Sequence, residues 1–212
     1  MRDKPLVLEP PVGERRVLLH TCCAPCSCSI IERILNADIE PTLYFYNPNI
    51  HPQDEYEIRK KEVVRYAEKK KIYFFDGDYE KELWFEMTKG HENAVERGAR
   101  CAICFDLRLG KTAECAQKNG FRVFTSSLGI SRWKDFDQVT LAGIKAAAKF
   151  PGLFYWPYNW RKEGGSERMF EISRDENFYR QRYCGCLYSL QHSHRRVLGG
   201  VNRVPLETEN DW

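Results

Sequence analysis

Short apolar stretches alternate with amphipathic segments along the first two thirds of the chain. The apolar stretches have the length of strands and are rich in branched and aromatic residues, whereas the amphipathic segments repeat their apolar residues with a helical period. Strands that alternate with helices favour a parallel sheet covered by helices on both faces. We therefore predict a three-layer α/β fold with strands at 16–20, 42–46, 72–75 and 121–126 and helices at 27–37, 54–70, 80–87, 101–118 and 166–179.

Two loops of this predicted sheet lie where ligands usually bind. In parallel α/β sheets, ligands collect beyond the carboxyl ends of the strands, near the point where the strand order reverses. The cysteine-rich loop at 22–28 follows the first predicted strand, and a second loop at 125–134 leaves the fourth. We expect these two loops to line one pocket.

The last part of the chain combines basic and aromatic residues. No acidic residue occurs between Asn177 and Pro205, while Arg180 and Arg182 alternate with tyrosines. Such a segment can neutralise phosphates and stack unpaired bases, although a solvated basic helix with core aromatics has the same composition. We predict a single metal-binding α/β domain at 1–205 that includes this basic, aromatic segment at 177–205, followed by a disordered tail at 206–212.

The overall composition is that of a soluble globular protein. Hydrophobic residues make up 42% and charged residues 30% of the 212 residues, and the formal net charge is only +3. No stretch approaches the roughly 20 apolar residues that span a bilayer, and the first 14 residues lack the apolar core of a secretory signal. We therefore expect a cytoplasmic protein that does not bind a membrane.

Nine cysteines provide the strongest chemical signal, because eight of them are clustered. The number is odd and too low for a disulfide scaffold, and cysteines in a reducing compartment are more often metal ligands or redox groups. A CxxC at a helix start puts two sulfur atoms on one face, where the helix dipole favours thiolate. The clustered cysteines are Cys22, Cys23, Cys26 and Cys28, the CxxC pair Cys101 and Cys104, and the CxC pair Cys184 and Cys186.

The vicinal pair Cys22-Cys23 favours an inorganic group larger than a single zinc ion, because adjacent cysteines serve one tetrahedral ion only with strain. Zinc and thiol–disulfide chemistry remain alternatives. We expect Cys28 and Cys115 to be packed thiols, which leaves seven cysteines for metal. Four would hold one iron–sulfur cluster, and the other three imply a second metal or redox-active thiols.

The chain contains five motifs that together are specific: His20-x-Cys22-Cys23-Ala24-Pro25-Cys26, Cys101-x-x-Cys104-Phe105-x-Leu107-Arg108, Ser127-Leu-Gly-Ile-Ser-Arg-Trp-Lys134, Tyr158-Asn-Trp-Arg-Lys162 and Tyr183-Cys184-Gly185-Cys186. In this order they resemble the motifs of the QueH-type epoxyqueuosine reductases. The resemblance extends from about Val17 to Leu190.

This resemblance implies a Rossmann-like parallel sheet related to the adenine-nucleotide alpha hydrolase fold. Those relatives carry a glycine-rich phosphate loop after the first strand, whereas this chain has the cysteine loop Thr21–Cys26 there. The resemblance therefore implies no ATP, and the family also works without cobalamin. Its implied reaction is the last step of queuosine formation, in which two electrons and two protons remove the epoxide oxygen of epoxyqueuosine at the wobble position of tRNA. An external electron donor and a tRNA carrying epoxyqueuosine in its anticodon loop are the implied partners.

The resemblance also assigns residues to this chemistry. It implies a [4Fe-4S] cluster and an adjacent mononuclear iron, with catalytic roles for the ligands of that iron, for Lys134 and for Asp135. The implied cluster ligands are Cys22, Cys23, Cys101 and Cys104, the implied iron ligands are Cys26, Cys184 and Cys186, and the expected tRNA contacts are Arg132, Arg161, Lys162, Arg180 and Arg182.

Two other classes of function fit the same residues. One is a zinc-stabilised RNA-binding protein without redox activity, and the other is a cytosolic electron carrier or redox sensor. Iron and acid-labile sulfide in anaerobically purified protein are the deciding measurement: four or more irons with sulfide would support the reductase, and stoichiometric zinc without sulfide would rule it out.

Overall fold

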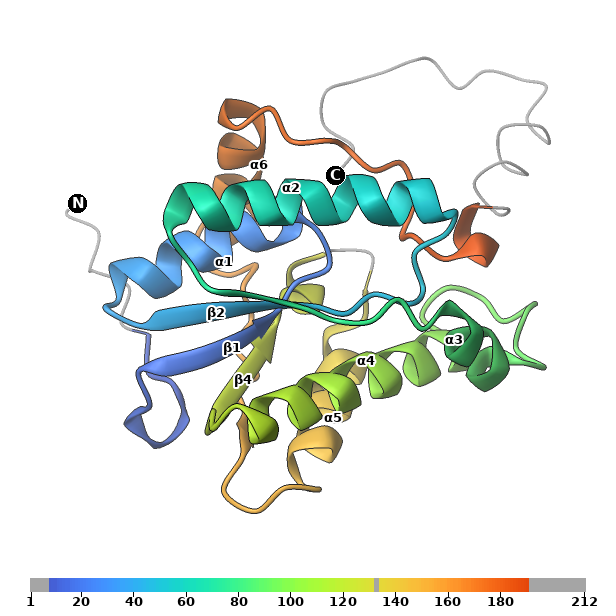
Figure 1. Ribbon diagram of the computed structural model, residues 1–212, viewed down its shortest axis with the longest axis horizontal. Helices are drawn as coiled ribbons and strands as arrows, with labels where there is room; N and C mark the ends of the chain where they lie inside the picture. Colours follow the sequence, from blue (N-terminus) through green and yellow to red (C-terminus); the bar gives the residue numbers. More distant parts are fainter. Residues whose placement is uncertain (1–7, 132–133, 191–212) are drawn as a thin grey trace.

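A five-stranded parallel sheet forms the centre of the molecule (Figure 1). The structure, a computed structural model, describes residues 8–131 and 134–190. The strand order is β3-β2-β1-β4-β5. The strands are β1 (Arg16–His20), β2 (Glu40–Phe45), β3 (Phe74–Asp76), β4 (Val123–Ser126) and β5 (Phe154–Tyr155). The helices are α1 (Ala24–Asn36), α2 (Gln53–Lys70), α3 (Lys81–Thr88), α4 (Ala99–Lys118), α5 (Phe136–Ala147) and α6 (Gly165–Asp175), with short 3-10 turns η1 (Pro11–Gly13) and η2 (Ser127–Ile130).

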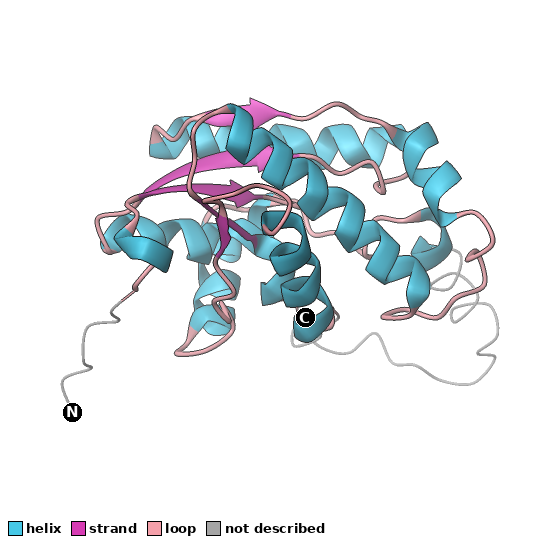
Figure 2. Ribbon diagram, turned by 90° about the horizontal axis from the view of Figure 1, so that it is seen from below, coloured by secondary structure: helices cyan, strands magenta, loops and turns pink. Residues whose placement is uncertain are grey.

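Helices cover both faces of the sheet. On one face α1 packs against α2 and α6, and on the other α4 packs against α5 (Figures 1 and 2). Because both faces are covered, consecutive residues of the central strands are buried rather than every second one, and Val17, Leu18 and Leu19 of β1 are completely buried. The prediction of a three-layer parallel α/β fold is therefore confirmed.

Several elements differ from the sequence-based expectation. Helix α1 begins at Ala24 rather than at residue 27, because Pro25 fits the first turn of a helix, so Cys26 and Cys28 lie in the helix and not in a loop. Helix α6 ends at Asp175 rather than at 179. Strand β5 and helix α5 were not predicted. Gly143 lets α5 approach the sheet closely, since a Cβ atom there would lie 2.5 Å from the ring of Tyr155.

Some predicted features fall outside the described residues. Arg132, the basic segment beyond Leu190 and the tail at 206–212 are among them, so their predicted roles stay predictions. No described helix is long and apolar enough to cross a membrane.

Candidate metal centre

The loops after β1 and β4 meet where the strand order reverses. The chain leaves β1 toward β2 and leaves β4 toward β5, so the two connections diverge to opposite sides of the sheet. The Cys22 backbone N–H donates to the Ser127 Oγ atom over 3.1 Å, which ties the two loops together at this switch point. The two loops therefore touch, but of their residues only Lys134 lines the cavity described below.

His20 fixes the end of β1 beneath this point. Its Nδ1 atom lies 2.9 Å from the Ser126 Oγ atom, and its Nε2 atom lies 3.2 Å from the Tyr46 carbonyl oxygen. Because a carbonyl can only accept, Nε2 is assigned the proton and Nδ1 accepts from the serine hydroxyl. Burial, reinforced by Arg108, lowers the pKa of His20 to about 3, so the ring is a neutral structural group.

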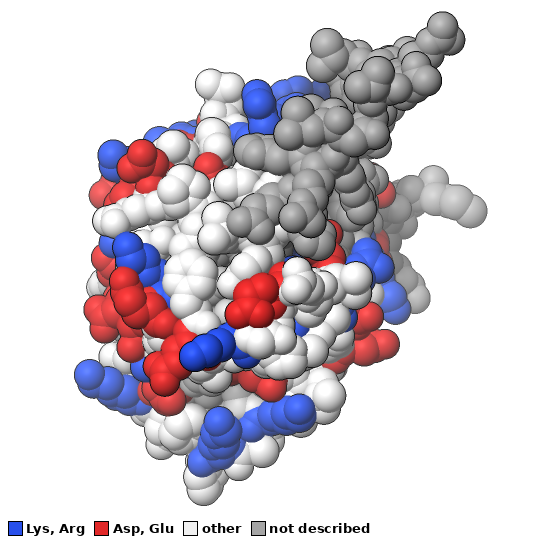
Figure 3. All heavy atoms as spheres, turned by 90° about the vertical axis from the view of Figure 1, so that its right-hand side faces the viewer, with Lys and Arg blue, Asp and Glu red and all other residues white. Residues whose placement is uncertain are grey.

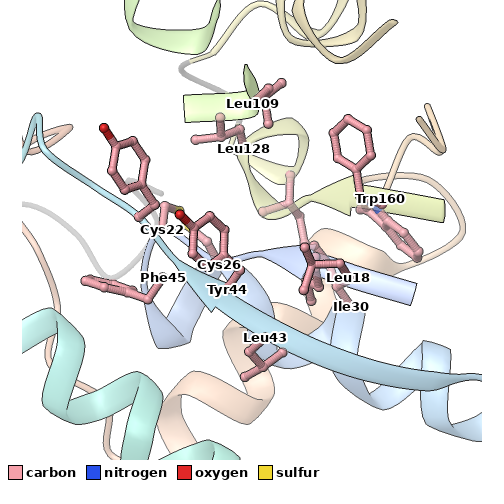
Figure 4. Packing of buried hydrophobic residues seen from close by; sticks show 14 of the residues in the cluster. Leu18, Cys22, Cys26, Ile30, Leu43, Tyr44, Phe45, Leu109, Leu128 and Trp160 are labelled. Atoms are coloured by element: carbon pink, nitrogen blue, oxygen red, sulfur yellow. The ribbon is translucent and has the colours of Figure 1, made fainter. Parts of the chain in front are cut away.

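Three cysteines from the β1–α1 junction form a compact thiol group. The sulfur atoms of Cys22, Cys23 and Cys26 all lie within 4.8 Å of one another, and all three residues are buried. Figure 4 shows Cys22 and Cys26 where this junction meets the apolar core. Cys23 is the N-cap of α1, so the positive end of the helix dipole lies beside the sulfur atoms.

The three thiols share charge unequally. Hydrogen bonds from Cys23 and Cys26 lower the pKa of Cys22 well below its usual range, and the same interactions raise the pKa of Cys26. Burial raises the pKa of Cys23 to about 12. Cys22 is therefore the thiol of this group that ionises most readily, and binding a cation to all three sulfur atoms releases protons.

A second group of four cysteines lines one cavity next to this junction. Cys101 and Cys104 come from the first turns of α4, and Cys184 and Cys186 come from the segment after α6. Cys104 and Cys186 are buried, Cys101 is half-buried and Cys184 is exposed. The complete lining is Asn49, Trp84, Glu96, Arg97, Arg100, Cys101, Cys104, Phe105, Arg108, Lys134, Cys184, Cys186 and Ser189.

Two cations connect the cysteine groups. Arg108 interacts electrostatically with Cys22 of the first group and with Cys104 of the second. Lys134 lines the cavity and interacts with Cys184 as well as with Cys22. Burial by itself would lower the pKa of Lys134, but the neighbouring sulfur atoms outweigh it and raise that pKa. The two groups therefore face a shared pair of positive charges.

Buried contacts hold the segment that carries Cys184 and Cys186. Arg59 donates to the backbone oxygen atoms of Tyr183 and Cys184 over 3.1 and 3.2 Å, and the His51 N–H donates to the Gly185 oxygen over 2.8 Å. Gly185 has a φ of +119°, a conformation that only glycine adopts readily. A Cβ atom there would lie 3.1 Å from both Arg59 Nη1 and Ile50 Cγ1.

Gly185→Ala is therefore expected to lower the free energy of unfolding by about 1–3 kcal/mol and to displace the Cys184 segment. Urea unfolding and the bound metal per chain measure the two effects. Gly152→Ala is the matched control, because Gly152 also has a positive φ of +82° but no atom within 4 Å of an added Cβ. It should lose some stability and keep its metal, and a Gly185→Ala protein with full metal content would contradict the argument.

His51 makes stability depend on pH. Its ring contacts Trp84 and Phe85, and its two ring nitrogen atoms are buried without hydrogen-bond partners among the described residues. Burial lowers the pKa of His51, and the positive charge of Lys81 acts in the same direction, so that the pKa falls from 6.5 to about 4. Between these two values the unfolded chain takes up a proton that the folded chain does not, so stability falls as the pH falls. After allowance for solvent screening, wild type should lose about 1 kcal/mol more than His51→Phe between pH 7 and pH 5. Urea unfolding at both values checks this, and equal losses would contradict it.

The other predicted site residues have varied surroundings. Lys134 lines the cavity, whereas the Asp135 carboxylate accepts from the Gln138 N–H over 2.9 Å and caps α5. Arg161 is half-buried and donates to the backbone oxygens of Ser131 and Lys134, so it supports the loop that carries Lys134. The remaining described candidates for tRNA contact are exposed: Lys162, Arg180 and Arg182. The described atoms of this end of the molecule carry acidic and basic side chains side by side rather than one basic patch (Figure 3).

Sequence reasoning missed several polar residues at this site. Gln181 donates from Nε2 to the Cys23 sulfur over 2.9 Å, and Asn49 lines the cavity with a buried Oδ1 atom that has no partner among the described residues. Asn49 follows the carboxyl end of β2, a position that the switch-point rule could have indicated. Gln181 carries no such signal, because its segment is irregular.

The donor set fits a thiolate-bound metal centre. All nine cysteines are free, and seven of them belong to the two groups that face Arg108 and Lys134. Soft thiolate sulfur atoms select zinc, copper(I) and iron–sulfur clusters, and seven exceed the four that one zinc ion uses. This arrangement favours a polynuclear centre.

Comparison with known proteins identifies the family. A family model described as epoxyqueuosine reductase QueH matches residues 17–192. The chain belongs to the QueH family. Epoxyqueuosine reductase QueH of Haemophilus influenzae is 57% identical over 188 residues, which cover 89% of this chain and 77% of that protein. QueH of Acinetobacter baylyi is 52% identical over 96% of this chain and 94% of its own length. QueH of Thermotoga maritima is 33% identical over 82% of this chain and 90% of its length.

A solved structure has the same fold as this QueH-family chain. It is the U34-tRNA thiolase NcsA from Methanococcus maripaludis with its [4Fe-4S] cluster, at a TM-score of 0.50 and 11% identity, covering 89% of this chain and 65% of that chain. At this identity the similarity concerns the fold alone. It agrees with the Rossmann-like architecture expected from the sequence.

Proposed function

We propose that this chain is an epoxyqueuosine reductase that converts epoxyqueuosine to queuosine in tRNA. Its membership of the QueH family supports the activity. The observation that carries the proposal is the convergence of two cysteine groups from distant parts of the chain on Arg108 and Lys134. Removal of the epoxide oxygen needs electrons that an iron–sulfur centre can deliver, whereas a structural zinc site needs only four ligands and supplies no electrons.

The seven cysteines would hold iron in two adjacent sites. In this proposal Cys22, Cys23, Cys101 and Cys104 bind a [4Fe-4S] cluster, and Cys26, Cys184 and Cys186 bind an additional iron. The position of Cys26 within 4.8 Å of Cys22 and Cys23 requires the two sites to be neighbours. When bound, these groups would supply one-electron transfer and Lewis acidity.

The reaction consumes two electrons and two protons. Both carbon–oxygen bonds of the epoxide break, a carbon–carbon double bond forms, and the oxygen leaves as water. The electrons come from an external donor. Lys134 holds a proton at Nζ in the cavity, and its raised pKa keeps it charged at neutral pH. Its proton can still move to the departing oxygen, because water and alcohols are far weaker acids than an ammonium group.

We further propose that Arg180 and Arg182 contact tRNA phosphates, since both are exposed on the segment that leads to Cys184. The doubly substituted Arg180→Gln, Arg182→Gln protein should bind an epoxyqueuosine anticodon stem-loop more weakly. Its log Kd should also depend less steeply on log salt, by about 1.4, at ~0.7 for each lost phosphate contact. Fluorescence anisotropy across a salt series measures both.

The matched control replaces Lys145 and Lys149 with glutamine. These exposed lysines lie near the carboxyl end of α5, and that helix runs away from the site over 12 residues. Binding by this control should keep the wild-type slope. An unchanged slope in the double arginine variant would refute the proposed contacts.

The test of the activity is conversion of a stem-loop that carries epoxyqueuosine. Protein purified without oxygen, supplied with a chemical reductant, should yield queuosine, which nucleoside mass spectrometry detects as the loss of one oxygen atom. Iron-loaded protein that leaves the epoxide intact would refute the proposal.

A further inference from the structure

Two buried arginines face the second cysteine group without an acidic partner. Arg100 is 1% exposed and Arg108 is 2% exposed, and both line the cavity with Cys101, Cys104 and Cys186. The cavity has four basic residues and one acidic residue, Glu96, whose carboxylate accepts from Ser189 over 2.9 Å. Positive charge therefore dominates the lining.

The protein satisfies these guanidinium groups only in part. Arg100 donates from Nη1 to the backbone oxygen atoms of His91 and Glu92, and Arg108 donates from Nη2 to Asn47 Oδ1. The Nε and Nη2 atoms of Arg100 and the Nε atom of Arg108 have no hydrogen-bond partner among the described residues. Neither arginine forms an ion pair with a carboxylate in the part of the chain that the structure describes.

Buried cations of this kind require an anion close by. An isolated charge in a protein interior is costly unless a counter-charge and hydrogen bonds compensate for it. At 1–2% exposure the two guanidinium groups are too buried to meet a tRNA phosphate at the surface. The Arg100 guanidinium lies 4.8 Å from the centre of the Tyr188 ring. The anionic groups beside the two arginines are thiols, since Arg100 interacts with Cys101 and Cys186, and Arg108 interacts with Cys104.

We infer that Arg100 and Arg108 are the counter-charges of the metal–thiolate centre and that they make this centre easier to reduce. The inference rests on the proposed function, because it concerns a redox-active centre. Adding an electron increases the negative charge beside the guanidinium groups, so their attraction stabilises the reduced form more than the oxidised form. Their unpaired N–H groups can also donate to sulfur, which shifts the potential in the same direction. Both residues are positioning and electrostatic groups, not metal ligands.

The test is a redox titration of the iron-loaded protein, followed by absorbance and electron paramagnetic resonance. Arg100→Met should shift the ratio of reduced to oxidised centre at least about 10-fold toward oxidised at a fixed ambient potential, which corresponds to ~59 mV for one electron. Arg100→Lys, which keeps the charge, should restore most of the wild-type ratio. If Arg100 had only a structural role, a positive charge alone in Arg100→Lys would not restore the wild-type ratio.

Lys111→Met is the matched control. Lys111 lies on the same helix α4, but it is partly exposed and pairs with Glu80 over 3.2 Å, so its removal should leave the ratio unchanged. If Arg100→Met binds no iron, the same titration is made on Arg100→Gln and on Arg108→Gln. These variants retain a hydrogen-bonding side chain and lose the positive charge, so they test the effect of the charge on the potential. The inference would be overturned if iron-loaded variants that lack the positive charge showed the wild-type ratio of reduced to oxidised centre.

Failure of the proposed function gives a different result. In that case the wild-type protein itself has no reducible iron centre. If the wild-type protein has a reducible iron centre and the arginine variants have the same potential, only the role of the two arginines is refuted.

Discussion

Replacing Cys23 with serine is expected to abolish both iron binding and epoxide reduction. Cys23 is 1% exposed, and its sulfur lies 3.7 Å from that of Cys22 at the start of α1. A serine hydroxyl has the same shape but is not the soft thiolate ligand that iron–sulfur clusters use. The visible absorption of the cluster and the iron content should fall to background, and no queuosine should form.

Cys28→Ser is the matched control for this prediction. Cys28 is equally buried in the same helix, but its thiol donates to the Pro25 backbone oxygen over 3.2 Å and lies outside the three-thiol group. Burial raises its pKa to about 12, so it stays a neutral thiol. This variant should retain its iron and its activity. Normal iron content in Cys23→Ser would show that Cys23 is not a ligand of the metal centre.

Replacing Cys184 with serine is expected to abolish epoxide reduction and to spare the cluster absorption. Cys184 is exposed at the cavity, unlike the other three cysteines of its group, and it is proposed as a ligand of the additional iron. Loss of one ligand at that site leaves the four proposed cluster ligands intact. Absorption spectra and queuosine formation, measured on the same anaerobic preparation, separate the two effects.

The spectrum of Cys184→Ser also tests how the cysteines are divided. Cluster absorption that disappears with this variant would show that Cys184 is a cluster ligand, and the proposed division between the two sites would be wrong. Cys115→Ser, a change in a half-buried thiol beside Asn119 on α4, should affect neither property.

The fold was predictable where strands are buried on both faces. Strand β1 has the consecutive apolar residues Val17, Leu18 and Leu19, and β2 and β4 also contain short apolar runs, so the alternation of strands with helices indicated the parallel sheet. Helix α5 was missed and β5 contains only two residues. Their position depends on tertiary contact between Gly143 and Tyr155, which local patterns do not contain.

The site was predictable only as a set of chemical groups. Clustering in the sequence indicated the cysteines, and the switch-point rule placed Cys22 next to the loop after β4. Long-range packing decides which thiols lie together. The grouping of Cys26 with Cys22 and Cys23 is therefore visible only in the folded structure. The same holds for Arg100, because its burial and its missing partners are properties of the folded chain.

Iron and acid-labile sulfide in protein purified without oxygen test the central claim most directly. The claim is that sulfur atoms from three separate parts of the chain together form an iron-bearing redox centre. It predicts at least about four iron atoms per chain, with sulfide, in the wild-type protein. One equivalent of zinc without sulfide would contradict it and would favour a zinc-stabilised RNA-binding protein.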